Sequence, residues 1–170
     1  MAIKASEFDN GKWDSGLPPV TALLGDEAFF ITRTGDLWRQ TGKDQGFTER
    51  LILYQTESDL ANRLLSELDA LSLFADRALV ELRLTKTTLD KSLREALDRW
   101  TQNPPEDKRL LISGPKLGKS EASTTWFQTL ETAAAVIEAT PVPTYQFATW
   151  LEAELESHQI VMDQDARSAV

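Results

Sequence analysis

The residues whose types and spacing come closest to supporting chemistry lie in segment 114–120, Gly-Pro-Lys-Leu-Gly-Lys-Ser. In a phosphate-binding loop, glycines let backbone N–H groups surround a phosphate, while Lys and Ser reach the phosphate and its Mg²⁺. That loop has about four residues between its first glycine and its Gly-Lys-Ser. Here only three residues separate Gly114 from Gly118. Pro115 also lacks the N–H that such a loop uses. We therefore interpret the segment as a turn that leads into a helix with a basic first residue. The alternative hypothesis is a small nucleotide-binding protein that uses Gly114 to Ser120.

The first predicted strand–helix junction, where α/β proteins usually hold a nucleotide, is acidic. Residues 24–28 are Leu-Gly-Asp-Glu-Ala, with no lysine and no second glycine. Asp26 and Glu27 complement the dipole at a helix start, but they would repel a triphosphate. Neither junction therefore supports an ATPase.

Other groups that could perform catalysis are sparse. His158 is the single histidine, and its polar neighbours predict a solvated side chain. The chain has no cysteine, which excludes thiol chemistry, and one histidine without cysteine cannot form a usual zinc site. No Gly-x-Ser-x-Gly nucleophile elbow occurs. The sequence predicts a non-catalytic protein with no cofactor and no metal.

The charge balance is acidic, with 27 acidic and 18 basic residues and a formal net charge of −9. Binding DNA by phosphate neutralisation needs clustered Lys and Arg. Basic pairs occur at Lys108 and Arg109 and at Lys116 and Lys119, and a solvated face is the simpler interpretation of both pairs. We expect weak or no direct DNA binding.

The composition is that of a globular protein, with 41% hydrophobic and 26% charged residues. No apolar run approaches the ~20 residues that a membrane helix needs. Residues 1–8 lack the apolar core of a signal peptide. We therefore expect a cytoplasmic protein whose length allows one full domain and the start of a second.

Strand and helix patterns alternate along the chain. Helices are indicated by apolar residues at steps of three and four, as in the series Leu89, Leu93, Leu97 and Trp100. Five short apolar segments are predicted to be strands: 20–24, 50–54, 78–84, 109–113 and 134–139. Strands separated by helices predict an α/β fold with a mainly parallel five-stranded sheet that is flanked by helices on both faces.

Pro141 and Pro143 mark a predicted domain boundary, which divides the chain into residues 1–140 and 141–170. Beyond the prolines, Phe147, Trp150 and Leu151 begin another amphipathic helix, and Asp163 is a candidate N-cap for one more. A helix of about two turns is marginal on its own. We expect residues 141–170 to be the truncated beginning of a second, helical domain.

Segment 70–77 does not fit the helix that leads into it. Leu60, Leu64, Leu68 and Leu71 follow one another at helical spacing and form one apolar face. At about 100° per residue, a continuing helix would place Leu73 opposite that face and Phe74 at its edge. These two side chains must be covered by a chain reversal or bind a partner.

Several motifs resemble, in the same order, those of the delta subunit family of the bacterial DNA polymerase III clamp loader, which opens the ring-shaped sliding clamp. The resemblance covers roughly residues 20–170 and rests on segments 23–27 (Leu-Leu-Gly-Asp-Glu), 46–50 (Gly-Phe-Thr-Glu-Arg), 71–77 (Leu-Ser-Leu-Phe-Ala-Asp-Arg) and 110–120, and on Trp126-Phe127 and Trp150-Leu151.

The resemblance implies an AAA+-type clamp-binding domain over residues 1–140, with a degenerate nucleotide site, followed by the start of a small helical lid domain. It also implies a C-terminal collar domain, which is expected to be missing here and which assembles the loader with the gamma/tau and delta-prime subunits. The implied activity is to bind and open the sliding clamp, the beta subunit, during DNA replication, without ATP hydrolysis.

The family's exposed hydrophobic motif that grips the clamp corresponds to Leu71, Ser72, Leu73 and Phe74. Many clamp-binding peptides begin this motif with glutamine, whereas Asp69 lies two residues before Leu71 here. A third hypothesis is a structural α/β domain in which Leu73 and Phe74 pack internally. By its helical phase, Leu71 fits the core face as well as the motif.

Overall fold

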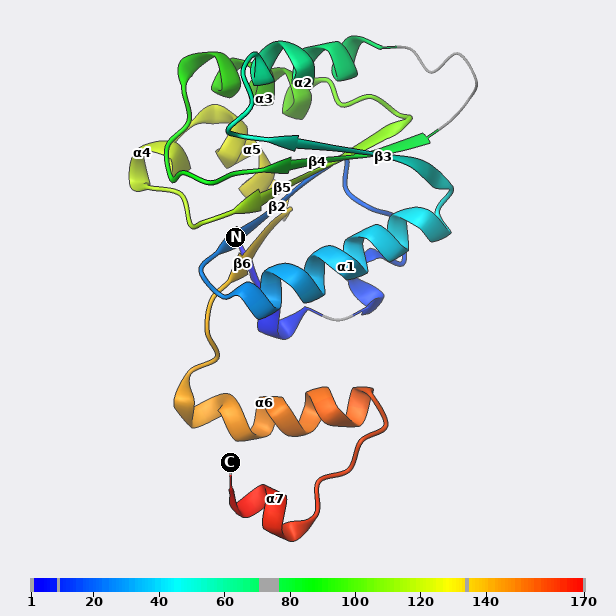
Figure 1. Ribbon diagram of the computed structural model, residues 1–170, viewed down its shortest axis with the longest axis vertical. Coiled ribbons are helices and arrows are strands. Elements are labelled where there is room, and N and C mark those ends of the chain that lie inside the picture. The colour runs from blue at the N-terminus through cyan, green and yellow to red at the C-terminus, as the bar shows by residue number, and fades with distance from the viewer. Residues whose placement is uncertain (1, 9, 71–76, 134, 170) are drawn as a thin grey trace.

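The computed structural model describes residues 2–8, 10–70, 77–133 and 135–169. After two short 3₁₀ turns, η1 (Ala5–Glu7) and η2 (Asn10–Trp13), strands and helices alternate (Figure 1). The strands are β1 (Ile3–Lys4), β2 (Val20–Gly25), β3 (Phe47–Tyr54), β4 (Arg77–Arg83), β5 (Lys108–Gly114) and β6 (Val136–Ala139). The helices are α1 (Ala28–Asp44), α2 (Leu60–Asp69), α3 (Lys91–Gln102), α4 (Lys119–Ala122), α5 (Thr125–Thr132), α6 (Thr144–Ser157) and α7 (Gln164–Ser168).

The strands form one sheet in the order β1-β6-β2-β5-β4-β3, and all the described pairings are parallel. The predicted α/β class and parallel sheet are therefore confirmed. The sheet has six strands and not five, because β1 pairs Ile3 with Ile137 at the edge. A strand of two residues is too short to produce the alternation from which strands are predicted.

Helices cover both faces of the sheet. Helix α1 lies on one face, while α2, α3, α4 and α5 lie on the other (Figure 1). Strand β4 shows how the sequence builds both layers: Val80 and Leu82 pack under α3, and Leu79 packs toward Trp38 of α1. Alternate residues of a strand point to opposite faces, so a strand buried on both faces is almost continuously apolar.

The sequence predicts one helix around residues 120–132 that buries Trp126, Phe127 and Leu130, but the structure has two helices there. Helix α4 ends at Ala122, and α5 starts at Thr125. Between them, the Ser123 hydroxyl donates to the carbonyl of Ser120, and the Thr124 hydroxyl donates to the carbonyl of Glu121. Such local side-chain bonds compete with a continuous helix. The predicted burial of Trp126, Phe127 and Leu130 is confirmed.

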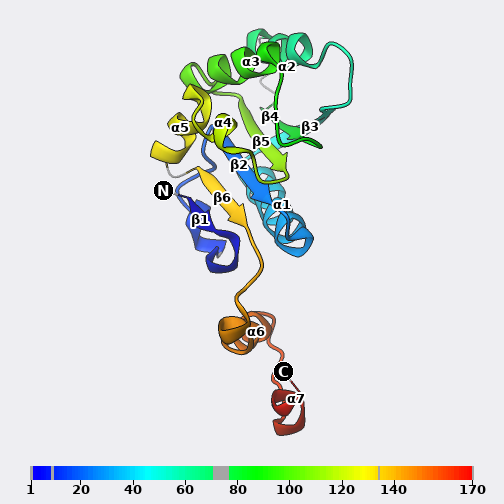
Figure 2. The ribbon, with the colours of Figure 1, turned by 90° about the vertical axis from the view of Figure 1, so that its left-hand side faces the viewer.

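Helices α6 and α7 extend away from the sheet and its helices (Figure 1, Figure 2). Asp163 caps α7 as predicted, accepting a hydrogen bond from the N–H of Ala166 at 2.8 Å. The main ion pair back to the sheet domain is bidentate: the Arg33 guanidinium of α1 donates twice to Glu154, at 2.8 Å each. Across the described part of the chain, none of the helices has the length and apolar character needed to cross a membrane.

Candidate functional site

The site predicted from the sequence, Leu71, Ser72, Leu73 and Phe74, lies outside the residues that the structure describes. The described flanks are α2, which ends at Asp69, and β4, which begins at Arg77. The apolar face of α2 packs as expected, with Leu60 and Leu64 buried and Leu68 packed against the same core. The predicted segment thus connects two elements whose positions are fixed.

The C-terminus of α2 is held by a buried lysine. Lys108 of β5 is 5% exposed, and its ammonium group donates to the carbonyls of Glu67 and Ala70, the latter at 2.9 Å. The Trp100 indole of α3 donates to the carbonyl of Leu64 at 2.9 Å. The last carbonyls of a helix lack partners within the helix, so Lys108 supplies bonds that α2 cannot, while Trp100 bonds a carbonyl in the middle of α2. The prediction of a solvated Lys108 is wrong, because its ammonium group is needed at this helix end.

The start of β4 is held by stacked arginines. The Arg77 guanidinium donates to the carbonyl of Gln45 at 2.8 Å and lies 4.2 Å from the centre of the Phe47 ring. The Arg109 guanidinium lies 4.9 Å from the same ring. Burial and the charge of Arg77 lower the pKa of Arg109. Arg109 is therefore half-buried beside an aromatic ring, and the expectation of a solvated side chain is wrong for it too.

Segment 114–120 is used for packing in the described structure. A side chain at Gly114 would place its Cβ 2.7 Å from the Leu84 carbonyl oxygen, so the glycine permits close approach of β4. The Gly118 N–H donates to the carbonyl of Thr87 at 3.3 Å, and Leu117 is buried. The helix that follows has four residues. This arrangement does not favour the nucleotide-binding alternative. The Lys119 side chain is exposed, as predicted, and titration of the chain with Mg²⁺ and ATP tests that alternative directly.

The junction between β2 and α1 is closed by an acidic cap. Gly25 has φ +155°, and a Cβ there would fall 2.0 Å from the carbonyl oxygen of Ala139. The Glu27 carboxylate accepts a hydrogen bond from the Phe29 N–H at 3.3 Å, which places a negative charge at the start of α1. A phosphate would have to displace that carboxylate.

An apolar hollow of about 320 Å³ lies beside this junction. Phe29 and Phe30 of α1 contact Trp150 of α6, with ring centres 5.9 Å and 5.5 Å apart. Pro141, Val142 and Phe147 complete the apolar lining, and Glu27 supplies the one charged side chain among the residues that line it. An apolar hollow with a carboxylate at its rim is poorly matched to a triphosphate.

Two carboxylates that the sequence analysis missed are fully buried. Burial acts to raise the pKa of Glu81, but hydrogen bonds from Arg39 and Arg50 outweigh it and lower that pKa to about 2. Glu121 bonds Arg94 and the Leu89 N–H, and its pKa is also lowered. The detectable signal was a charged residue within an apolar strand, Glu81 in β4. Among the described residues, no group of three or more His, Asp or Glu side chains is placed to hold a metal ion.

The solved structure of the Bacillus subtilis DNA clamp loader delta protein is similar to this fold. The TM-score is 0.65 at 17% sequence identity, and the match covers 91% of this chain and 48% of that protein. The fold is therefore that of a parallel α/β domain similar to the clamp loader delta protein, with an acidic cap at the strand–helix junction where α/β folds usually bind nucleotide.

A family model described as DNA polymerase III, delta subunit, matches residues 22–140. The chain belongs to this family. It is 25% identical to the Escherichia coli DNA polymerase III subunit delta over 157 residues, which cover 92% of this chain and 46% of that subunit. The chain thus spans about half the length of the relatives that it matches.

Proposed function

We propose that this chain is the part of a clamp loader delta subunit that binds and opens the sliding clamp, and that it does so without hydrolysing ATP. Leu71, Ser72, Leu73 and Phe74 form the proposed clamp-binding motif. The observation that carries the proposal is the family match over residues 22–140, which spans this motif.

The flanking structure supports this assignment of the motif. Lys108 bonds the end of α2 and Trp100 bonds its middle, while Arg77, the first residue of β4, bonds the carbonyl of Gln45. Fixed ends reduce the conformational entropy that the connecting segment loses on binding. Burying a Leu or Phe side chain is worth about 1.5–3 kcal/mol, so two or three such side chains in one pocket supply most of a useful affinity.

Opening the ring requires more than affinity. A ligand shifts a conformational equilibrium only by its differential affinity for the two states. We propose that the motif binds more tightly to a clamp in which one subunit interface is open than to the closed ring. The acidic cap at Glu27 supports a role without nucleotide chemistry at the β2–α1 junction.

The domain organisation follows from the same proposal. Residues 1–140 are the proposed AAA+-like clamp-binding domain, and residues 141–170 begin the helical lid. Assembly with gamma/tau and delta-prime subunits is proposed only for a chain that carries the collar domain. The described contacts between the two parts are few, chiefly Arg33 with Glu154 and Trp150 with Phe29 and Phe30.

The test is the affinity of the chain for purified sliding clamp, measured by surface plasmon resonance. The double variant Leu73→Ala/Phe74→Ala should weaken binding at least about a hundredfold, because two buried anchors are lost. The variant Tyr145→Ala/Val161→Ala is a matched control, since both residues are 83% exposed on the α6–α7 segment. The control should bind as the wild type does.

Thermal unfolding of the same variants separates the alternatives. If Leu73→Ala/Phe74→Ala binds the clamp at wild-type strength, the assignment of the site is wrong. If it instead lowers the free energy of unfolding by several kcal/mol, Leu73 and Phe74 pack internally, as in a purely structural domain.

A further inference from the structure

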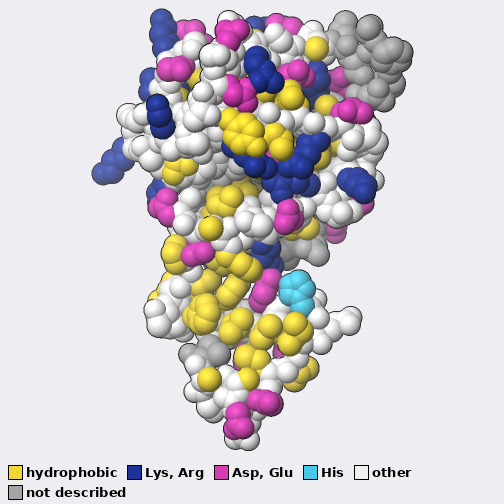
Figure 3. Space-filling view, viewed as in Figure 1, with side chains coloured by type: hydrophobic (Ala, Val, Ile, Leu, Met, Phe, Trp, Pro, Cys, Tyr) yellow, Lys and Arg dark blue, Asp and Glu magenta, His cyan; other side chains and the backbone are white. Residues whose placement is uncertain are grey.

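The face of the sheet that α1 leaves uncovered carries a cluster of arginines beside an exposed aromatic ring. Glu81 and Arg83 of β4 lie on the same face as Leu79, which packs toward α1. The parallel register sets Arg50 beside Leu79 and Tyr54 beside Arg83. Figure 3 shows Lys and Arg side chains gathered at the centre of this face, next to hydrophobic side chains.

One buried carboxylate organises the three arginines. Glu81 has no exposed side-chain surface, and it accepts hydrogen bonds from Arg39 at 2.8 and 3.1 Å, from Arg50 at 2.6 Å and from Arg83 at 3.3 Å. The Arg50 and Arg83 side chains remain 44% and 38% exposed. Each guanidinium has five N–H donors, so Arg50 and Arg83 keep donors beyond those that bond Glu81. Preoriented guanidinium donors suit phosphate oxygens.

The aromatic component of this surface is Tyr54, at the end of β3. Tyr54 is 42% exposed as a residue, and the Arg83 guanidinium lies 5.6 Å from the centre of its ring. The Tyr54 N–H donates to Glu57 at 2.8 Å, which fixes the backbone that presents the ring. An exposed ring next to cationic side chains is a stacking platform for an unpaired base.

A hollow of about 350 Å³ adjoins the arginines. Its floor is apolar, from Leu23, Ile31 and Leu111, and its rim carries Arg39, Arg83 and the Ser113 hydroxyl. This volume is within the range of pockets for small organic groups, about 300–1,000 Å³. It lies between the neighbouring strands β2 and β5, whose following helices, α1 and α4–α5, lie on opposite faces of the sheet (Figure 1). This is the usual ligand position in open α/β sheets.

We propose that Arg39, Arg50, Arg83 and Tyr54 form a binding surface for single-stranded DNA. Arg50 and Arg83 contact the phosphate backbone, Tyr54 stacks on one base, and the hollow accommodates a neighbouring nucleotide. The expectation of weak or no direct DNA binding came from the net charge of the whole chain, which does not show how its charges are distributed. An acidic peptide would satisfy the arginines, but it would leave the Tyr54 platform and the apolar floor unused.

The test is binding of a fluorescein-labelled oligothymidylate, followed by fluorescence anisotropy at two salt concentrations. Arg50→Ala/Arg83→Ala should weaken binding at least about tenfold and reduce the slope of log K against log salt by about 1.4, because each phosphate contact on a single strand contributes about 0.7. Tyr54→Ala should weaken binding at least about fivefold, and Tyr54→Phe should retain it.

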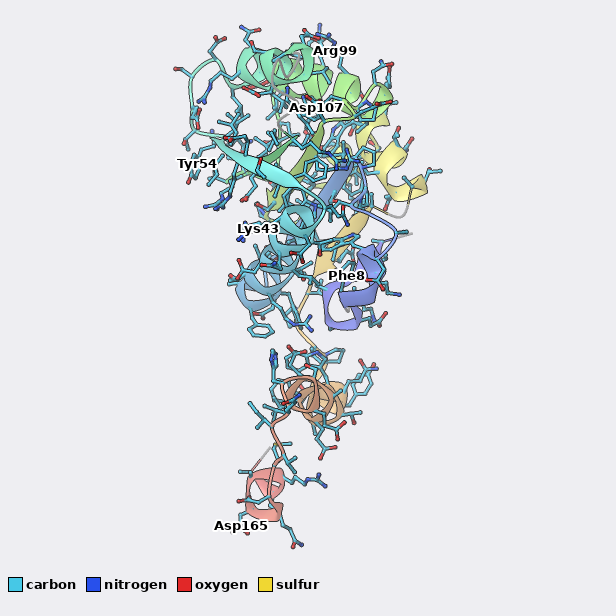
Figure 4. The ribbon with its side chains drawn as sticks, turned by 90° about the vertical axis from the view of Figure 1, so that its right-hand side faces the viewer. Phe8, Lys43, Tyr54, Arg99, Asp107 and Asp165 are labelled. Atoms are coloured by element: carbon cyan, nitrogen blue, oxygen red, sulfur yellow. The ribbon has the colours of Figure 1, made fainter. Side chains whose placement is uncertain are left out.

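The matched control is Arg63→Ala/Arg99→Ala. These arginines are 48% and 51% exposed, and they form ion pairs on α2 and α3. Figure 4 shows Arg99 in the helical layer, away from Tyr54 on β3. The control should bind the oligonucleotide as the wild type does. In Arg50→Ala/Arg83→Ala, Arg39 keeps its bidentate bond to Glu81. If that double variant is unstable, Tyr54→Ala provides a second test.

Three outcomes would overturn the proposal. They are unchanged oligonucleotide binding by both Arg50→Ala/Arg83→Ala and Tyr54→Ala, equal loss in the control, and displacement of the oligonucleotide by polyglutamate as effectively as by unlabelled DNA. Clamp affinity should be unchanged in Arg50→Ala/Arg83→Ala, so this proposal and the proposed function fail separately.

Discussion

At the scale of single residues, the buried carboxylate of Glu81 forms ion pairs with three arginines, Arg39, Arg50 and Arg83. A carboxylate without partners would be costly in this position, and hydrogen bonds from three arginines offset that cost. Removing the charge would leave the arginines without the anionic acceptor, whose two oxygens orient them. We therefore expect this residue to influence both stability and the shape of the proposed DNA surface.

The stability of the chain should depend on pH through Glu81. Its pKa is lowered from 4.5 to about 2 in the folded chain, so the folded state favours the ionised form. The stabilisation is fully present above pH 4.5 and is lost as the pH falls toward 2. Urea unfolding at a series of pH values should show this decline in the free energy of unfolding.

The variant Glu81→Gln isolates the contribution of this residue. It should be less stable than the wild type by about 3 kcal/mol at pH 7, as for a broken buried ion pair, and the difference should shrink as the pH falls from 4.5 to 2. A difference that stays constant over this range would show that the charge of Glu81 does not contribute.

At the scale of elements, the end of α2 depends on a side chain from a neighbouring strand. Lys108 reaches from β5 to the carbonyls of Glu67 and Ala70. A leucine-rich periodicity predicts the helix and its buried face, but it does not identify which distant residue caps it. This is why the sequence analysis assigned Lys108 to a solvated face.

Replacing Lys108 by methionine should separate this helix end from the sheet. Two carbonyls would lose their donor, which costs about 1–3 kcal/mol. Under the proposed function, Lys108→Met should also weaken clamp binding while Leu73 and Phe74 are intact. Hydrogen exchange should show faster exchange at the last turn of α2 and little change in β2.

Lys116→Met is the control for this variant, because Lys116 is exposed and its contact to Glu138 is long, at 3.9 Å. Equal effects of the two substitutions on clamp affinity would mean that Lys108 acts through net charge and not through the helix end.

At the scale of the whole molecule, residues 141–170 should be separable from the sheet. The described links are the Arg33–Glu154 ion pair and the contacts of Trp150 with Phe29 and Phe30. A chain of residues 1–140 should therefore fold, with a modest loss of stability as Phe29 and Phe30 become more exposed. Circular dichroism melting measures this, and an unfolded fragment would contradict the proposed domain boundary.

The sequence predicts the fold more fully than it predicts the sites. The alternation of apolar strands with amphipathic helices is set by local spacing, so the five longer strands and the stripe on α3 were predicted. The edge strand β1, the break after Ala122 and the arginines around Glu81 depend on contacts between distant segments or on local side-chain bonds. The Asp163 cap was predictable because its signal lies within four residues.

The position of β2 within the sheet sets the order in which the chain can fold. Ala22 of β2 pairs with Ile112 of β5 and Val136 of β6, and both partners follow far later in the sequence. During synthesis, β2 leaves the ribosome before either of its neighbours, and it has no strand on either side until β5 and β6 emerge. Such long-range pairing slows folding. The nascent chain should therefore stay open to proteases and chaperones until β6 is released.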